Sequence, residues 1–162
     1  MKHAQNYTEE QLAPFPKRFG RAPDFIIGPI DDPYLLRWWV IPRNEEGNHY
    51  RHIILRDDDD RALHDHPWQS VSVVRSGVLR EMLPGRVTRI LNIGMPYFRE
   101  AEQLHRLEVP EGPVETDFFT GPKIRDWGFA CGEDTPAGGW RIWSDFVADN
   151  PGEVGRGCGE MS

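Results

Sequence analysis

"LHDHPWQSVSVVRSG", residues 63–77, places two histidines one residue apart just before a short apolar run that ends at Gly77. A short apolar run of this kind, bounded by a glycine, is typical of a β-strand. In an extended chain, side chains at i and i+2 point to the same face, so His64 and His66 are expected to direct two imidazoles into one space. The segment predicts either one half of a metal site or two polar turn residues before a strand.

The rest of the chain predicts an all-β fold. The runs "YLLRWWVIP" (34–42) and "HYRHIILR" (49–56) flank a polar turn and indicate a hairpin. Further short β-rich runs follow, nearly all bounded by glycine, proline or acidic residues, among 14 prolines and 16 glycines in the chain. Thr8 and Gln11 form a capping-box pattern that predicts a short helix ending before Pro14. With no long amphipathic helix after residue 20, we expect a β-sandwich or barrel.

The length of 162 residues favours one domain. We expect an N-terminal arm over 1–30 that packs on a main β domain over 31–148, and a flexible glycine-rich tail over 149–162. The net charge of −7 argues against binding to nucleic acid, and no apolar stretch is long enough to suggest a membrane helix. Cys131 and Cys158 match no metal or redox spacing, so a reducing, cytoplasmic setting is expected.

A third histidine completes the candidate metal site. His105 lies in "EQLHRLEVP", where an extended strand would put it on one face with Leu107 and Val109. Taken alone, a histidine in phase with apolar residues is more often a hydrogen-bonded core residue than a ligand. Together with His64 and His66 in an all-β chain, the ligand interpretation becomes the stronger one.

The motifs resemble those of the cupins. "DDDDRALHDHPW" (57–68), with "TGPKIRDWGF" (120–129) and "GWRIWSDF" (139–146), is similar to a group of small bacterial and phage cupins built around HDHPW. The resemblance spans roughly 34 to 147 and implies a double-stranded β-helix, or jelly roll, with a metal near one mouth. The usual cupin motif has a glutamate where this chain has Ser70 or Val71, so that carboxylate ligand is missing.

The missing carboxylate shapes the expected function. Three neutral imidazoles leave a divalent ion with its full charge, which favours an anionic or chelating small-molecule substrate. Cupins with only histidine ligands include thiol and diketone dioxygenases, so the resemblance favours iron(II) and an O2-dependent oxidation. Zinc or nickel would fit the same imidazoles. The alternatives are a metal-dependent isomerase or hydrolase, and a non-catalytic ligand-binding cupin.

Other residues are candidates for the surroundings of the site. Asp65 should point away from the two imidazoles, either capping an amide or fixing a tautomer. The sequence predicts substrate contacts from four residues: His52, Trp68, Arg125 and Arg141. Arginine is the natural clamp for a carboxylate. Asp57 to Asp60 resemble a solvated turn paired with Arg56 and Arg61. Sheet edges and exposed tryptophans favour a homodimer.

Overall fold

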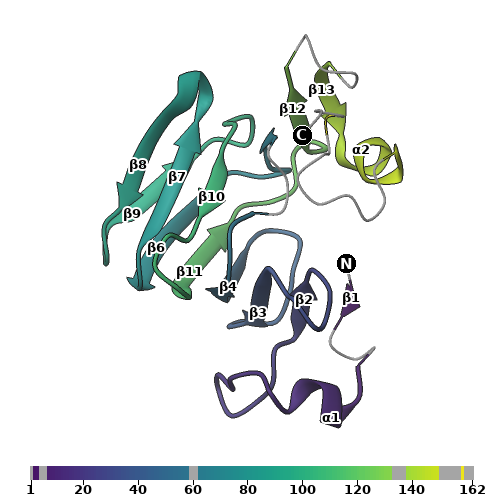
Figure 1. Ribbon diagram of the computed structural model, residues 1–162, viewed down its shortest axis with the longest axis vertical. Coiled ribbons are helices and arrows are strands. Elements are labelled where there is room, and N and C mark those ends of the chain that lie inside the picture. The colour runs from purple at the N-terminus through teal and green to yellow at the C-terminus, as the bar shows by residue number, and fades with distance from the viewer. Residues whose placement is uncertain (1, 4–6, 59–61, 133–137, 150–157, 159–162) are drawn as a thin grey trace.

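The computed structural model describes residues 2–3, 7–58, 62–132, 138–149 and 158, and strands dominate it (Figure 1). The strands are β1 (Lys2–His3), β2 (Phe25–Ile27), β3 (Leu35–Trp39), β4 (Asn48–Ile54), β5 (Leu63–His64), β6 (Ser70–Ser76), β7 (Leu79–Leu83), β8 (Val87–Leu91), β9 (Pro96–Arg99), β10 (Arg106–Glu108), β11 (Val114–Thr120), β12 (Gly128–Cys131) and β13 (Gly139–Ile142). The helices are α1 (Glu9–Leu12), a 3-10 turn (Pro84–Arg86) and α2 (Trp143–Asp149). The predicted all-β class is confirmed.

One antiparallel sheet of seven strands forms the larger layer, in the order β1-β2-β3-β4-β11-β6-β9. The predicted hairpin is confirmed, because β3 and β4 pair from Leu35 opposite Ile54 to Trp39 opposite Tyr50. Strand β11 comes from late in the chain and inserts between β4 and β6, pairing with both. This long-range insertion brings the two halves of the chain into one sheet.

Two three-stranded sheets, β10-β7-β8 and β13-β12-β5, complete the fold. An isolated antiparallel bridge between His64 and His105 joins them, and each amide donates to the other residue's carbonyl at 2.9 Å. The backbone itself therefore brings two of the predicted ligands side by side.

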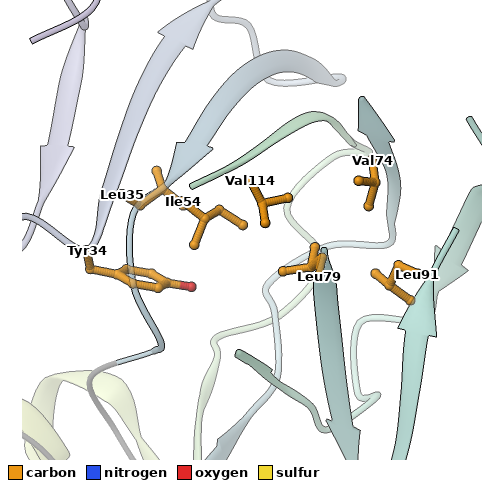
Figure 2. Close-up of a cluster of buried hydrophobic side chains, with 7 residues drawn as sticks. All are labelled: Tyr34, Leu35, Ile54, Val74, Leu79, Leu91 and Val114. Atoms are coloured by element: carbon orange, nitrogen blue, oxygen red, sulfur yellow. The ribbon is translucent and has the colours of Figure 1, made fainter. Parts of the chain in front are cut away.

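Apolar side chains from the large sheet and from β7 and β8 meet in one cluster between the layers (Figure 2). The cluster consists of Tyr34, Leu35, Ile54, Val74, Leu79, Leu91 and Val114, with Leu107 and Val109 packed against it. Gly77 makes the turn from β6 to β7 at a φ of 84°, and a Cβ there would lie 2.7 Å from the Pro113 carbonyl oxygen. Only glycine suits both constraints.

The outer face of β3 and β4 is covered by the N-terminal segment. Tyr7, Leu12 and Phe15 pack against a second apolar cluster that includes Leu36 and Trp38. The predicted capping box is confirmed, since Thr8 and Gln11 exchange hydrogen bonds at the start of α1. Segment 1–30 also contributes β1 and β2 to the large sheet, so it is more than a covering arm.

The C-terminal part differs from the sequence expectation in one element. The run "GWRIWSDFV" (139–147) is one of the short β-rich runs that predict a strand, but the strand ends at Ile142 and the chain continues as α2. Phe146 on this helix is buried and stacks on Phe129 of β12, with ring centroids 4.0 Å apart. The burial of one aromatic ring against β12 favours the helix over a longer strand.

The expectation of reduced cysteines is wrong. Cys131 on β12 and Cys158 form a disulfide with a Cα–Cα distance of 5.4 Å, although they lie 27 positions apart. The spacing of the two cysteines in the sequence carries no sign of this pairing. Disulfides are typical of oxidising compartments, so the cysteines no longer support a cytoplasmic location, which stays a prediction.

The predicted tail over 149–162 lies outside the described residues except for Asp149 and Cys158. Among the helices that the structure does describe, none has the length and apolar character needed to cross a membrane.

An ion-pair network covers the outer face of β4, β11 and β6. Glu115 accepts from Arg18 and Arg51, while Asp117 accepts from Arg51 and Arg75. These contacts are 2.8 to 3.0 Å long, and both carboxylates are mostly shielded from solvent. A shared network of this kind stabilises more than isolated surface pairs do.

The network makes stability depend on pH. Burial alone would raise the pKa of Asp117, but hydrogen bonds from His49 and Arg51 lower it below its usual value. The hydrogen bond from Arg18 lowers the pKa of Glu115. Because both pKa values lie below those of the unfolded chain, about 3.9 and 4.3, the network stabilises the fold above about pH 4. That contribution is lost as the pH falls through the lowered folded-state values.

We therefore expect Asp117→Asn to lower the free energy of unfolding by about 1 kcal/mol at pH 7 and to lose less stability than the native protein below pH 4. Urea unfolding between pH 7 and pH 3 measures both effects. Glu111→Gln, which removes an exposed carboxylate, serves as the control. Parallel pH profiles for the native protein and Asp117→Asn would contradict the role of the network.

Candidate metal centre

Three imidazoles converge where the two small sheets meet. His64 ends β5, His66 follows it, and His105 directly precedes β10. Their ring centroids lie 4.8 to 5.1 Å apart, and one nitrogen of each ring lies within 4.8 Å of the others. Nε2 of His66 and Nε2 of His105 approach to 2.8 Å. Two nitrogens bound to one ion at about 2.1 Å lie roughly 3 Å apart at a right angle, so the cluster fits a single ion.

Asp65 fixes the bend between the two histidines. It points away from them, as expected from the alternation, and is buried. Its carboxylate accepts hydrogen bonds from the Gly128 amide at 2.7 Å, from Arg125 at 2.6 Å and from Trp140 at 2.8 Å. A Cβ at residue 128 would lie 1.9 Å from the Arg141 carbonyl oxygen, so glycine is needed there. The amide that Asp65 caps thus belongs to a distant strand, β12.

The two arginines predicted as substrate clamps lie next to β12 in the chain or in the sheet: Arg125 precedes this strand, and Arg141 is on β13, which pairs with it. Arg125 forms its ion pair with Asp65, which favours a role in holding the HDH bend. Arg141 lies on β13 opposite Phe129 in the β12–β13 ladder. Substrate binding by either residue stays a prediction.

Glu81 is the residue of this site that sequence reasoning missed. It is fully buried on β7 and lies 2.8 Å from Nδ1 of His105, while Arg99 and Arg89 donate to the same carboxylate. Burial alone would raise its pKa, but hydrogen bonds from His105 and Arg99 and the charge of Arg99 lower the pKa to about 2. The ionised carboxylate keeps the proton of His105 on Nδ1 and leaves the Nε2 lone pair free. The sequence could have indicated its burial, because Glu81 lies two positions after the core residue Leu79 and therefore on the same face of β7.

Asp58 has the corresponding place at His64, with Oδ2 lying 3.2 Å from Nδ1. The expectation of a solvated turn holds for Asp57, which is exposed, but not for Asp58, whose side chain is 11% exposed. Asp57 accepts a hydrogen bond from the amide of Val109 at 2.7 Å, and Arg56 pairs with Asp32. Residues 59–61 lie outside the description. Two of the three imidazoles thus have a carboxylate at Nδ1, the usual outer partner of a metal-bound histidine.

Burial keeps the three imidazoles neutral. Burial, together with the positive charge of Arg99, lowers the pKa of His64 to about 4 and that of His105 to about 3. Burial also lowers the pKa of His66 well below its usual value. Neutral rings offer lone pairs to a cation at pH 7, so the donor chemistry fits a divalent transition metal.

Aromatic rings border His66 on the side of the large sheet. Trp68 stacks on the imidazole with centroids 4.7 Å apart, and its contact with a substrate stays a prediction. Phe118 of β11 lies 6.1 Å from His66 and 5.3 Å from His52. His52 is buried on β4 and accepts a hydrogen bond from Arg37, so it borders the site without joining the three-histidine cluster.

Among the described residues, the donors that converge are all imidazole nitrogens. Ser70, at one position where the usual cupin motif carries its glutamate, is buried on the inner face of β6. Val71 lies on the opposite face, paired with Phe98 and Phe119. The Glu81 carboxylate contacts Nδ1 of His105, on the ring side away from the cluster of Nε2 atoms.

Comparisons with solved structures identify the architecture. A putative mannose-6-phosphate isomerase from Ralstonia eutropha has a TM-score of 0.50 and 16% identity over 58% of this chain and 90% of that chain. A double-stranded β-helix protein from Klebsiella pneumoniae has a TM-score of 0.49 and 17% identity over 60% and 84%. A cupin domain of a transcriptional regulator from Enterobacter cloacae has a TM-score of 0.46 and 17% identity over 56% and 99%.

The predicted jelly-roll fold, a double-stranded β-helix, is confirmed. No family model matches the chain, and no curated protein matches it. At 16% identity the likeness shows the fold alone, and any statement about the reaction has to come from the residues of the site.

Proposed function

We propose that this cupin holds one divalent metal ion, iron(II) by preference, through His64, His66 and His105, and oxidises a small anionic substrate with O2. The observation that carries the proposal is the all-nitrogen cluster of three neutral, buried imidazoles with carboxylates behind two of them. Bound iron(II) would supply the activation of O2. Zinc or nickel would fit the same donors and would supply only Lewis acidity.

The chain's own residues would prepare the site in three ways. Glu81 and Asp58 orient the imidazoles of His105 and His64 through Nδ1. Arg99 pairs with Glu81 and keeps its carboxylate ionised behind His105. Trp68 and Phe118 present apolar rings beside His66 and would limit the access of water.

Oxygen uptake tests the reaction class. Tag-free protein would be stripped with chelator, loaded anaerobically with iron(II) or with zinc, and mixed with small carboxylates, thiols and β-diketones. We expect O2 consumption with iron(II) and none with zinc. Turnover by the zinc form without O2 uptake would assign a metal-dependent isomerase or hydrolase instead. Absence of stoichiometric metal after aerobic purification and after loading would favour a non-catalytic ligand-binding cupin.

The partner we propose is a second copy of this chain. Phe98 and Phe119 are both exposed and flank Val71 in one register row on the outer face of β9, β6 and β11. An exposed apolar row at a sheet edge is a common dimer surface. The homodimer stays a prediction.

A further inference from the structure

Arg37 lies on the inner face of the large sheet, in the same row as two other residues near the site. It pairs in register with His52 on β4, and His52 pairs with Thr116 on β11. Leu35, two positions earlier on β3, packs in the cluster between the layers, so the alternation puts Arg37 on that inner face. The sequence did not single out this arginine.

Neutral groups hold the guanidinium of Arg37. Nε donates to Nε2 of His52 at 2.8 Å, and the guanidinium carbon lies 4.6 Å from the centre of the Tyr50 ring. The Phe25 ring lies 5.9 Å away on the neighbouring strand. The hydrogen bond at Nε and the Tyr50 ring against the face of the guanidinium together fix its plane. Among the described residues, its two terminal nitrogens have no hydrogen-bond acceptor, and the residue keeps partial access to solvent.

The absence of a carboxylate sets Arg37 apart from the other arginines near the site. Arg99 pairs with Glu81, and Arg125 pairs with Asp65. In the described structure no acidic side chain contacts Arg37, and burial lowers its pKa to about 10, so it remains charged at pH 7. A cation that protein encloses in large part and that has no carboxylate partner is stabilised by an anionic ligand.

The guanidinium also lies toward the histidine cluster. His52 and Phe118 have ring centroids 5.3 Å apart, and Phe118 lies 6.1 Å from His66. Arg37 and the three imidazoles therefore border the same interior, with aromatic rings between them.

We propose that Arg37 receives the carboxylate of a small substrate with a flat apolar body, whose other end lies at the histidine cluster. This inference rests on the proposed function only in assuming that the substrate is anionic. With Nε held by His52, the two terminal nitrogens match the two oxygens of a carboxylate. A single guanidinium balances a monoanion, whereas a phosphate dianion would keep an uncompensated charge. Tyr50, Phe118 and Trp68 would supply apolar surroundings for the body of the ligand.

His52 is then a positioning residue. Because its Nε2 accepts a hydrogen bond from Arg37, the ring must be neutral, and burial holds its pKa well below the usual value. The imidazole sets the plane in which the terminal nitrogens lie, and does not itself contact the ligand.

Calorimetric titration of chelator-treated, tag-free protein with benzoate, benzamide and inorganic phosphate tests the inference. We expect benzoate to bind at least about tenfold more tightly than its neutral isostere benzamide, and more tightly than phosphate. Arg37→Gln should lose that preference, with benzamide binding unchanged. Arg75→Gln is the matched control, because Arg75 lies on the same sheet and pairs with Asp117 on the outer face.

Equal binding of benzoate and benzamide by the native protein would overturn the inference, and so would tighter binding of phosphate. Both comparisons need no variant, so they decide the matter even if Arg37→Gln fails to fold. A folded Arg37→Gln protein that keeps the preference for benzoate would overturn it as well. Because the titration uses metal-free protein, its result is independent of whether the chain binds a metal. If the protein binds benzoate selectively but binds no metal, the carboxylate site is supported and the oxygenase proposal is contradicted.

Discussion

Replacing His105 by alanine is expected to abolish stoichiometric metal binding. The native, tag-free protein should bind about one ion per chain, and His105→Ala less than a tenth of that after the same loading and desalting. His105 is one of the three donors that converge among the described residues, its Nε2 lies 2.8 Å from that of His66, and Glu81 contacts its Nδ1. The loss should therefore exceed the 10- to 100-fold weakening that is typical when an outer partner of a ligand is removed.

Elemental analysis and thermal unfolding measure the effect independently. Metal at about a hundred times its dissociation constant stabilises a folded protein by about 2.7 kcal/mol, so chelator should lower the melting temperature of the native protein. It should leave that of His105→Ala unchanged. The control is His49→Ala, because His49 pairs with Asp117 on the outer face of β4. If His105→Ala keeps one ion per chain, the centre lies elsewhere and the oxygenase proposal has no foundation.

The parts of the fold that the sequence predicts are those with a local pattern. Apolar runs with bounding turns indicated β3, β4, β6, β7 and β11, and the capping box at Thr8 indicated α1. The strands β5, β9 and β12 are two to four residues long and take their pairing from neighbours that are distant in the chain. Such strands carry no periodicity of their own, because tertiary contacts define them.

The same holds for the site: the sequence predicts the residues with a local pattern and misses the residues that strand pairing brings together. The spacing of His64 and His66 indicated a shared face, and the phase of His105 with Leu107 indicated the core side of a strand. The partners of those rings were missed. Glu81 and His105 are neighbours only because β7 and β10 pair, and Arg37 reaches the interior only through its register with His52. The spacing of residues along the chain does not show which charged side chains become neighbours when distant strands pair.

Replacing Glu81 by glutamine is expected to have the largest effect on stability. Glu81 is fully buried and Arg99 is 1% exposed, so the variant leaves a buried guanidinium without its carboxylate. Removing one partner of a buried ion pair costs about 3 to 5 kcal/mol in the free energy of unfolding. The variant should also bind metal roughly 10- to 100-fold more weakly, because the proton on Nδ1 of His105 loses its anionic acceptor.

Urea unfolding of the metal-free protein and competitive metal titration separate these two losses. Glu100→Gln is the matched control, since Glu100 is an exposed carboxylate that accepts from Gln69, and its change should stay within about 0.5 kcal/mol. Equal stability and equal metal affinity of Glu81→Gln and the native protein would contradict the assigned role of the carboxylate.

A double-mutant cycle identifies the cause of the destabilisation. If the cost arises from the uncompensated charge of Arg99, then Arg99→Gln should be much less harmful when Glu81 is already glutamine. We expect a coupling free energy of at least about 1.5 kcal/mol between the two substitutions. Additive effects would instead assign the loss to packing around each side chain. In the coupled case the pair acts as one unit, in which Arg99 keeps Glu81 ionised and Glu81 keeps the His105 imidazole ready for a metal.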